Sequence, residues 1–229
     1  MRRFTDSLAF FFLLIFSLFS VHSAYGINAR VLRQDVKPAT QAMMEHQDID
    51  DAILAATNYI VTTNAGPTSA AAAAITSFAH QPDVPRNLTI TPTGTTGDVE
   101  ACVITVTGTN YFGSTITEDF TFVADASTVQ TGNKAFKTVS NIAFPASCES
   151  GGYAATWIVG VGSKLGLKRC MAQAGDLVFT VFNGAYESTR ATAAANASAV
   201  ESNTVIMNGT LDGAKDADIY FIQNWACLP

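Results

Sequence analysis

Three aspartates close together near the end of the chain are the residues best suited to hold a metal ion. Asp212, Asp216 and Asp218 stand in the stretch LDGAKDAD. Loop carboxylates at short spacing can bind calcium, although this spacing is not that of an EF-hand loop. An Asp-Gly pair is also typical of a solvent-exposed turn. We therefore expect a turn here, with calcium binding as the alternative.

Residues that could perform catalysis are few and badly spaced. The three histidines, His22, His46 and His80, form neither an H-x-H nor an H-E-x-x-H pattern, which argues against a histidine-based site. Ser163 and Lys164 are adjacent in GVGSKLG, and adjacent strand residues point to opposite faces, so they are not a nucleophile and its base. The glycines of this stretch predict a tight turn. We expect no catalytic residue, no cofactor and no enzyme activity.

The four cysteines are too widely spaced to indicate a zinc site. Disulfides form in exported proteins, whereas cysteines in the cytosol stay as thiols. Cys102 alternates with apolar residues in EACVITVTG, so we expect it to be a small buried hydrophobic residue. Cys148, Cys170 and Cys227 lie in loop-like surroundings and are the expected disulfide residues. If all four cysteines pair, three connectivities are open.

The composition favours strands and argues against a nucleic-acid partner. Of 229 residues, 48% are hydrophobic and only 14% are charged, and this balance favours strands and turns over long surface helices. The formal net charge is −6, and the 13 lysines and arginines are scattered along the chain. Binding to phosphates needs such residues in clusters.

Residues 1–26 have the layout of a secretory signal peptide. A basic start, MRRFTDS, precedes the apolar run LAFFFLLIFSLFSV and a small-residue end. The run is short for a bilayer span of roughly 20 residues. We expect the segment to be absent from the working protein, through cleavage near Ala24 or Gly26 or initiation at Met43 or Met44, so that the mature form has no membrane partner. A retained membrane anchor is the alternative.

Residues 27–84 are expected to form a linker and a short helical arm. In QDIDDAILAATNYI, the residues Ile49, Ile53, Ala56 and Ile60 recur at helical spacing. Asp48 precedes them and is suited to cap the helix.

Residues 85–229 predict a mainly β fold, an antiparallel β-sandwich. Runs such as STITEDFTFVA alternate apolar residues with threonine and are bounded by glycine, asparagine or proline. Asn183-Gly184, between two apolar runs, predicts a hairpin. The alternation predicts the following buried residues: Leu88, Ile90, Ile104, Val106, Phe120, Phe122, Phe136, Ile142, Phe144, Trp157, Val159, Phe179, Val181, Ile219 and Phe221.

Two further features fall in predicted loops. Tyr111 and Phe112 in TNYFGS predict either a contact pair at a loop tip or a hydrophobic corner of the core. Asn87, Asn196 and Asn208 begin glycosylation sequons, which matter only in a eukaryotic secretory pathway.

Five stretches follow one another along most of the chain: PDVPRNLTITPTG, TVTGTNYFGSTITEDFTF, GNKAFKTVSNIAFP, GVGSKLGLK and VESNTVIMNGTLDGAKDADIYFI. This succession, from Pro82 to Ile222, resembles a family of structural proteins of tailed-bacteriophage virions that includes head decoration proteins. The resemblance implies a location in the virion and no catalytic residues. It also implies the major capsid protein, other virion proteins and further copies of the chain as partners. The signal-like start and the four cysteines depart from the family pattern.

The alternative function is a secreted bacterial surface adhesin or a carbohydrate-binding β-sandwich module. The signal-like start and the possible disulfides favour this alternative, which implies a secreted or periplasmic location.

Overall fold

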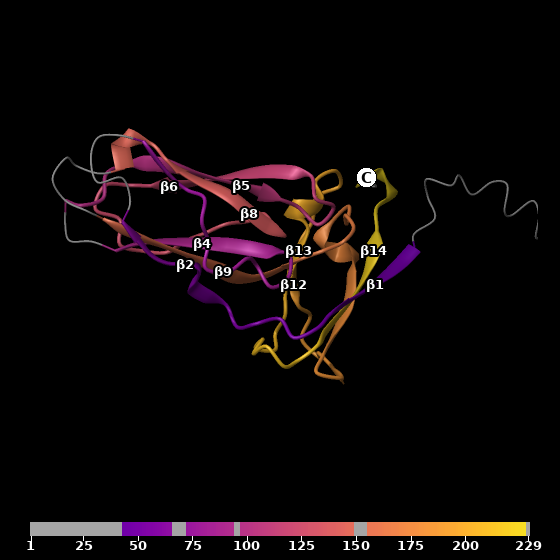
Figure 1. Cartoon of the computed structure of the whole chain (residues 1–229). Coiled ribbons are helices and arrows are strands. Elements are labelled where there is room, and N and C mark those ends of the chain that lie inside the picture. The colour runs from indigo at the N-terminus through magenta and orange to yellow at the C-terminus, as the bar shows by residue number, and fades with distance from the viewer. Residues whose placement is uncertain (1–42, 66–71, 94–96, 149–154, 228–229) are drawn as a thin grey trace, which may run out of the picture. The chain divides into compact units, whose positions relative to one another are not determined.

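The computed structural model describes residues 43–65, 72–93, 97–148 and 155–227 (Figure 1). The signal-like segment 1–26 and residues 27–42 of the expected linker lie outside the described residues. Within them the chain is mainly β, and every strand pair is antiparallel. None of the helical turns in these ranges has the length and apolar character needed to cross a bilayer.

The described strands form three sheets, which we call A, B and C. Sheet A has the order β1 (Met43–Ile49), β14 (Ala217–Gln223), β10 (Leu177–Phe182) and β11 (Ala185–Tyr186). Sheet B has the order β12 (Thr192–Ala194), β13 (Thr204–Ile206), β9 (Thr156–Gly166), β4 (Arg86–Thr93) and β7 (Gln130–Thr131), and β2 (Ala56–Ala65) also pairs with β9. Sheet C has the order β3 (Ala73–Ile75), β8 (Thr138–Phe144), β5 (Cys102–Thr109) and β6 (Thr115–Phe122). Short 3₁₀ turns lie at η2 (Ala146–Cys148), η3 (Ala174–Asp176), η4 (Val200–Ser202) and η5 (Trp225–Cys227).

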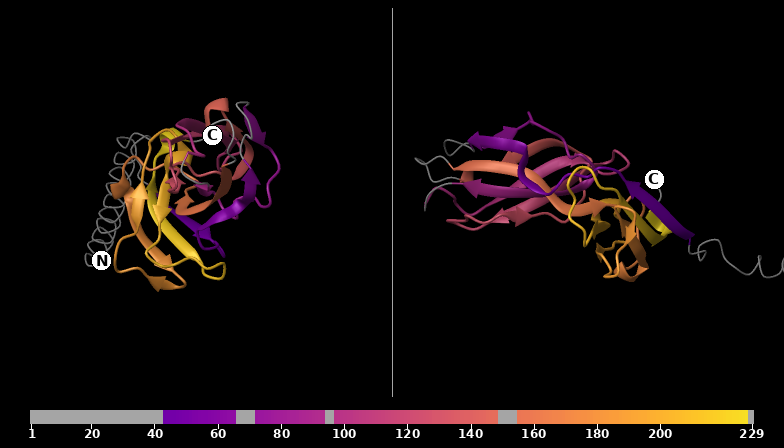
Figure 2. Two further views of the ribbon diagram at one scale, coloured as in Figure 1. Left: turned by 90° about the vertical axis from the view of Figure 1, so that its left-hand side faces the viewer. Right: turned by 90° about the horizontal axis from the view of Figure 1, so that it is seen from below.

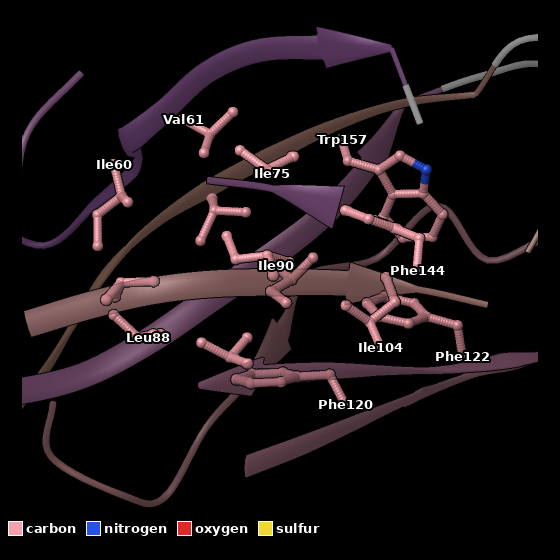
Figure 3. Packing of buried hydrophobic residues seen from close by; sticks show 14 of the residues in the cluster. Ile60, Val61, Ile75, Leu88, Ile90, Ile104, Phe120, Phe122, Phe144 and Trp157 are labelled. Atoms are coloured by element: carbon pink, nitrogen blue, oxygen red, sulfur yellow. The ribbon is translucent and has the colours of Figure 1, made fainter. Parts of the chain in front are cut away.

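Sheets B and C share one hydrophobic core. Its buried residues come from β2, β4 and β9 on one side and from β3, β5, β6 and β8 on the other. Trp157 of β9 packs against both Phe122 and Phe144, with ring centroids 5.0 and 5.5 Å away (Figure 3). Alternation along β5 and β6 directs their apolar residues into this core, because every second side chain points to the same face of a sheet, whereas β4 and much of β9 are buried on both faces.

A second core lies beneath sheet A. It contains Ile49 of β1, Leu177 of β10 and Phe221 of β14, together with Leu165 at the end of β9 and Val205 of β13. β1 and β14 run side by side here, although one opens and the other closes the described chain (Figures 1 and 2). β9 therefore contributes to both cores.

The predicted helix from Ile49 to Ile60 is wrong. Ile49 ends β1, where it pairs with Ala217 of β14, and Ile60 lies inside β2. Between the strands the chain turns at Asp51, which has a φ of 48°. The two isoleucines are buried because their strands pair with distant partners, and that pairing overrides the helical spacing. With β1, β2 and β3 all before residue 85, the sheets extend into the segment expected to be linker and arm.

The tight turn predicted at GVGSKLG is also wrong, because this stretch continues strand β9. Its glycines allow close packing instead. A Cβ at Gly160 would lie 1.8 Å from the carbonyl oxygen of Ala56, and one at Gly162 would lie 2.4 Å from the side-chain amide of Asn87. At Gly160 the obstacle is backbone, so that a side chain there would displace β2, whereas at Gly162 it would displace the side chain of Asn87.

The predicted core is confirmed except at two residues of β10. Phe179 and Val181 are only partly buried, whereas Leu177 and Thr180 face the core. The register of β10 against β14 shifts between Leu177 and Phe179, and such a bulge reverses which face the following side chains occupy.

The hairpin predicted at Asn183-Gly184 is confirmed. Val181 pairs with Tyr186 and Phe182 with Ala185, and both turn residues have positive φ, 49° and 72°. Two positive φ angles are the signature of the turn that Asn-Gly favours.

Candidate functional site

The three aspartates considered for calcium each interact with a different residue and do not share a site. Asp212 forms a salt bridge of 2.6 Å with Lys215, which lowers the pKa of the Asp212 carboxyl. Asp218 accepts a hydrogen bond from the ring of His46 at 2.7 Å, and Asp216 is exposed and accepts through its carbonyl oxygen from the N–H of Asn183. Within the described ranges no three His, Cys, Asp or Glu residues are grouped to hold a metal ion.

All four cysteines form disulfides, so the interpretation of Cys102 as a lone buried residue is wrong. Cys102 is buried and pairs with Cys148, and Cys170 pairs with Cys227, with Cα–Cα distances of 5.0 and 5.7 Å. Cys102 opens β5 and Cys148 ends η2, just after β8, which pairs with β5. Alternation identified the burial of Cys102 but gave no information on its partner.

A buried arginine ties β4 to β9. The Nε and one terminal nitrogen of Arg86 both donate to the carbonyl oxygen of Gly162, with an Nε distance of 2.7 Å. The other terminal nitrogen donates to the carbonyl oxygen of Ile53 at 2.9 Å and to the Asp83 carboxylate at 3.1 Å. Burial lowers the pKa of the Arg86 guanidinium, and Asp83 opposes that shift. A buried charge needs such a full set of partners.

The next residue, Asn87, joins three stretches of chain. Its side-chain amide donates to the carbonyl oxygen of Gly132 at 3.1 Å, and its side-chain oxygen accepts from the backbone N–H of Lys164 at 2.9 Å. The Lys164 ammonium in turn donates to Gly132 at 3.0 Å and to the Asn133 side chain at 2.6 Å. Asn87 is fully buried, so its sequon is closed to a glycan in the folded protein.

Glu118 on β6 binds the loop that contains Gly132, Asn133 and Lys134, on the side opposite Asn87. Its carboxylate accepts the backbone N–H groups of Asn133 at 2.6 Å and Lys134 at 3.2 Å. The Lys134 ammonium donates to the carbonyl oxygen of Thr117 at 2.8 Å. Burial raises the pKa of the Glu118 carboxyl, and the two N–H groups oppose that shift. The lysine-bearing loop is thus fixed by bonds on both sides.

We call this network the Asn87 junction, defined by Arg86, Asn87, Glu118, Gly132, Asn133, Lys134, Gly162 and Lys164. These residues come from four of the five stretches identified in the sequence. The fifth stretch joins through two backbone bonds: Ala135 donates to the carbonyl of Glu201 at 2.7 Å, and Leu167 donates to that of Asn203 at 2.9 Å. Five stretches that are far apart in the sequence therefore meet in one region.

A second feature is the outer face of sheet A, on the side away from its core. Rings from neighbouring strands stack across it: His46 on Tyr220 with centroids 4.4 Å apart, Tyr220 on Phe179 at 4.3 Å, and Phe179 near Tyr186 at 6.1 Å. His46 and Tyr186 are exposed. Sequence reasoning missed this face because the bulge in β10 turned Phe179 outward.

The predicted loop pair Tyr111 and Phe112 packs at a corner of the fold. The rings meet edge to face at 5.8 Å, and Phe112 lies against the Cys170–Cys227 disulfide cluster. The guanidinium of Arg169 lies 5.6 Å from the centre of the Phe112 ring. This arrangement favours the corner of the core over a free contact pair.

The surface hollows near residues 208 and 209 hold no reactive group. A pocket of about 210 Å³ is lined by Leu54, Ser163 and Met207, and a neighbouring one of about 340 Å³ by Tyr186 and Glu187, among others. The Glu187 carboxylate already accepts from the N–H of Gly209 at 2.7 Å and the Thr180 hydroxyl at 2.6 Å.

No family model, curated protein or solved structure matches the chain.

Proposed function

We propose that the chain is a structural protein of a tailed-bacteriophage virion, most simply a capsid decoration or minor capsid protein. In this proposal sheets B and C form its β-sandwich, and the protein covers or reinforces the shell. Its partners are the major capsid protein or other virion proteins, and it acts as one of many copies on a lattice.

One observation carries this proposal: the five stretches that resemble the virion family meet at the Asn87 junction. Arg86, Asn87 and Glu118 are occupied by hydrogen bonds to backbone groups of other stretches. Residues used in this way maintain a framework, because satisfying buried polar groups fixes one arrangement of the chain. The residues that carry the resemblance are therefore framework residues, and this supports a protein whose role is structural.

The test is mass spectrometry of purified virions from the virus or prophage that encodes the chain. Peptides from residues 86–222 should be present at a constant ratio to the major capsid protein across particle preparations. Their absence from purified particles, with the protein present in the culture, would reject the proposal. Gene neighbours that encode portal, terminase or capsid proteins are an independent check.

The second candidate is the secreted adhesin or carbohydrate-binding module, which the two disulfides favour. Disulfides persist in oxidising compartments and are rare in the cytosol. The aromatic rings of sheet A give this candidate little support, because a sugar binds to the face of a ring and the rings of His46, Tyr220 and Phe179 are stacked on one another. N-terminal sequencing and glycan-array binding separate the two candidates: a mature start near Ala24 with glycan binding favours the adhesin.

A further inference from the structure

The outer face of sheet A presents apolar side chains in an ordered grid. We define the sheet A face as Met44, His46, Asp48, Phe179, Val181, Tyr186, Asp218, Tyr220 and Ile222. The strand register sets its rows: Met44 opposes Ile222, and His46 opposes Tyr220, which opposes Phe179. Met44 is 59% exposed and Tyr186 is 67% exposed. The face is thus a partly or fully exposed surface of six apolar residues, one histidine and two aspartates.

One corner of this face is acidic. Asp48 of β1 lies directly opposite Asp218 of β14, and Val181 and Tyr186 continue the same row. Like charges directly opposite each other destabilise a sheet. His46 bonds to Asp218 at 2.7 Å, whereas Asp48 has no salt-bridge partner among the described residues. The four strands contain no lysine or arginine, so the second carboxylate is uncompensated within the sheet.

We propose that the sheet A face docks another protein whose apolar surface carries lysine or arginine beside it. The stacked rings offer their edges and a low-entropy apolar surface, which suits protein contacts. A cation placed at Asp48 and Asp218 relieves the repulsion between the two carboxylates. The inference rests on this geometry alone and holds whether or not the partner belongs to a virion.

Other occupants fit this face less well. A second copy would bring its own carboxylates to a surface without lysine or arginine, and burying unpaired charge is costly. Nucleic acid and anionic lipid headgroups are repelled by the same carboxylates. For a sugar, the ring of Tyr220 is covered by those of His46 and Phe179, and the exposed ring of Tyr186 does not account for the acidic corner. A protein with a cationic and apolar surface is the occupant that matches both the apolar residues and the acidic corner of the face.

The probe is a short soluble peptide of alternating valine and lysine, titrated into the disulfide-bonded protein and followed by amide shifts in NMR spectra. We expect the shifts to concentrate in β1, β14, β10 and β11. Tyr186→Ser should weaken binding about tenfold, since exposed aromatic anchors dominate such contacts. Asp48→Asn should weaken it about fivefold, and added salt should weaken binding to the original protein more than to this variant.

Matched control variants distinguish specific binding at the sheet A face from non-specific binding elsewhere on the protein. Val123, after β6, is 69% exposed, so Val123→Ser removes a comparably exposed apolar group elsewhere. Asp119→Asn removes an exposed charge from β6. Neither should change binding by more than about twofold. A peptide with glutamate in place of lysine should not bind.

Three results would overturn the proposal. The first is no saturable binding of the lysine peptide, and the second is equal binding of the glutamate peptide. The third is dimerisation in light scattering that Tyr186→Ser abolishes, because this would identify a second copy as the occupant. Loss of binding in a variant supports the proposal only if the variant unfolds at the same temperature as the original protein. The outcome is independent of whether virions contain the protein, so the two proposals fail separately.

Discussion

Arg86 of β4 donates two hydrogen bonds to a single carbonyl oxygen, that of Gly162 on β9. The β4–β9 register shifts at this point, so that Arg86 pairs with Leu165 but Leu88 pairs with Val161. Three residues of β9 therefore face one residue of β4. The side chains of Arg86 and Asn87 supply bonds where the ladder is irregular, which satisfies buried backbone groups that would otherwise be costly.

Replacing Arg86 with methionine should destabilise the protein strongly. Arg86→Met removes the guanidinium that donates to the carbonyls of Gly162 and Ile53 and to the Asp83 carboxylate, which keeps the backbone N–H of Ile53 as a donor. We expect the free energy of unfolding to fall by about 3–5 kcal/mol, as when one partner of a buried ion pair is removed. Chemical denaturation measures this. Lys215→Met, at the exposed pair with Asp212, is the control and should change little; a stable Arg86→Met variant would contradict the role assigned to Arg86.

A methyl group at Gly160 should disrupt the β2–β9 pair. The added Cβ would lie 1.8 Å from the carbonyl oxygen of Ala56, so the backbone of β2 must move. We expect Gly160→Ala to lose about 1–3 kcal/mol of unfolding free energy, as overpacked sites do. Gly175→Ala is the matched control, because its nearest neighbours are at 3.6 Å. Equal melting temperatures for the two variants would show that β2 does not approach Gly160 so closely.

Glu118 should make stability depend on pH. Burial raises its pKa in the folded protein above the usual 4.5, so the folded state binds the proton more tightly than the unfolded state. Its favourable contribution is therefore full below the unfolded pKa and is lost as the pH rises through the folded pKa. Glu118→Gln cannot titrate but keeps an acceptor for the loop N–H groups.

The measurement compares the unfolding free energies of the original protein and Glu118→Gln at acid and at neutral pH. The original protein should lose stability relative to the variant as the pH rises above the usual carboxyl pKa of 4.5. A difference that is constant with pH, or that changes in the opposite direction, would show that the loop bonds outweigh desolvation.

Both disulfides should contribute to stability, and neither should leave a free thiol. The Cys102–Cys148 and Cys170–Cys227 bridges close loops with separations of 46 and 57 residues. Each should stabilise by about 2–4 kcal/mol, chiefly by restricting the unfolded chain. The double variant Cys102→Ala/Cys148→Ala and its counterpart at the other bridge test them one at a time. Thiol labelling of the unreduced, denatured protein would contradict the pairing.

Alternation along single strands was sufficient to predict most of the core. Phe120 and Phe122 lie in β6 and Trp157 lies at the start of β9, and in both places every second residue faces inward. The same reasoning was wrong for Phe179 and Val181, because a bulge changes the phase without a clear mark in the sequence. The helix prediction at Ile49 and Ile60 was made from helical spacing instead, and it was wrong because this spacing also arises by coincidence between two strands.

The Asn87 junction could not have been predicted from local patterns. Asn87 binds Gly132 and Lys164, which are 45 and 77 residues away. No periodicity links such positions, and nothing in the sequence distinguishes the buried Asn87 of β4 from an asparagine in a loop. The five ordered stretches did identify the segments that form the junction. They did not show how those segments meet.

The passage of β9 through both cores has a thermodynamic consequence. Trp157 and Val159 pack in the core of sheets B and C, while Leu165 of the same strand packs beneath sheet A. Neither core can melt without fraying the strand on which the other depends. The two cores should therefore unfold in one cooperative transition, with a single calorimetric peak and similar hydrogen-exchange protection along β9.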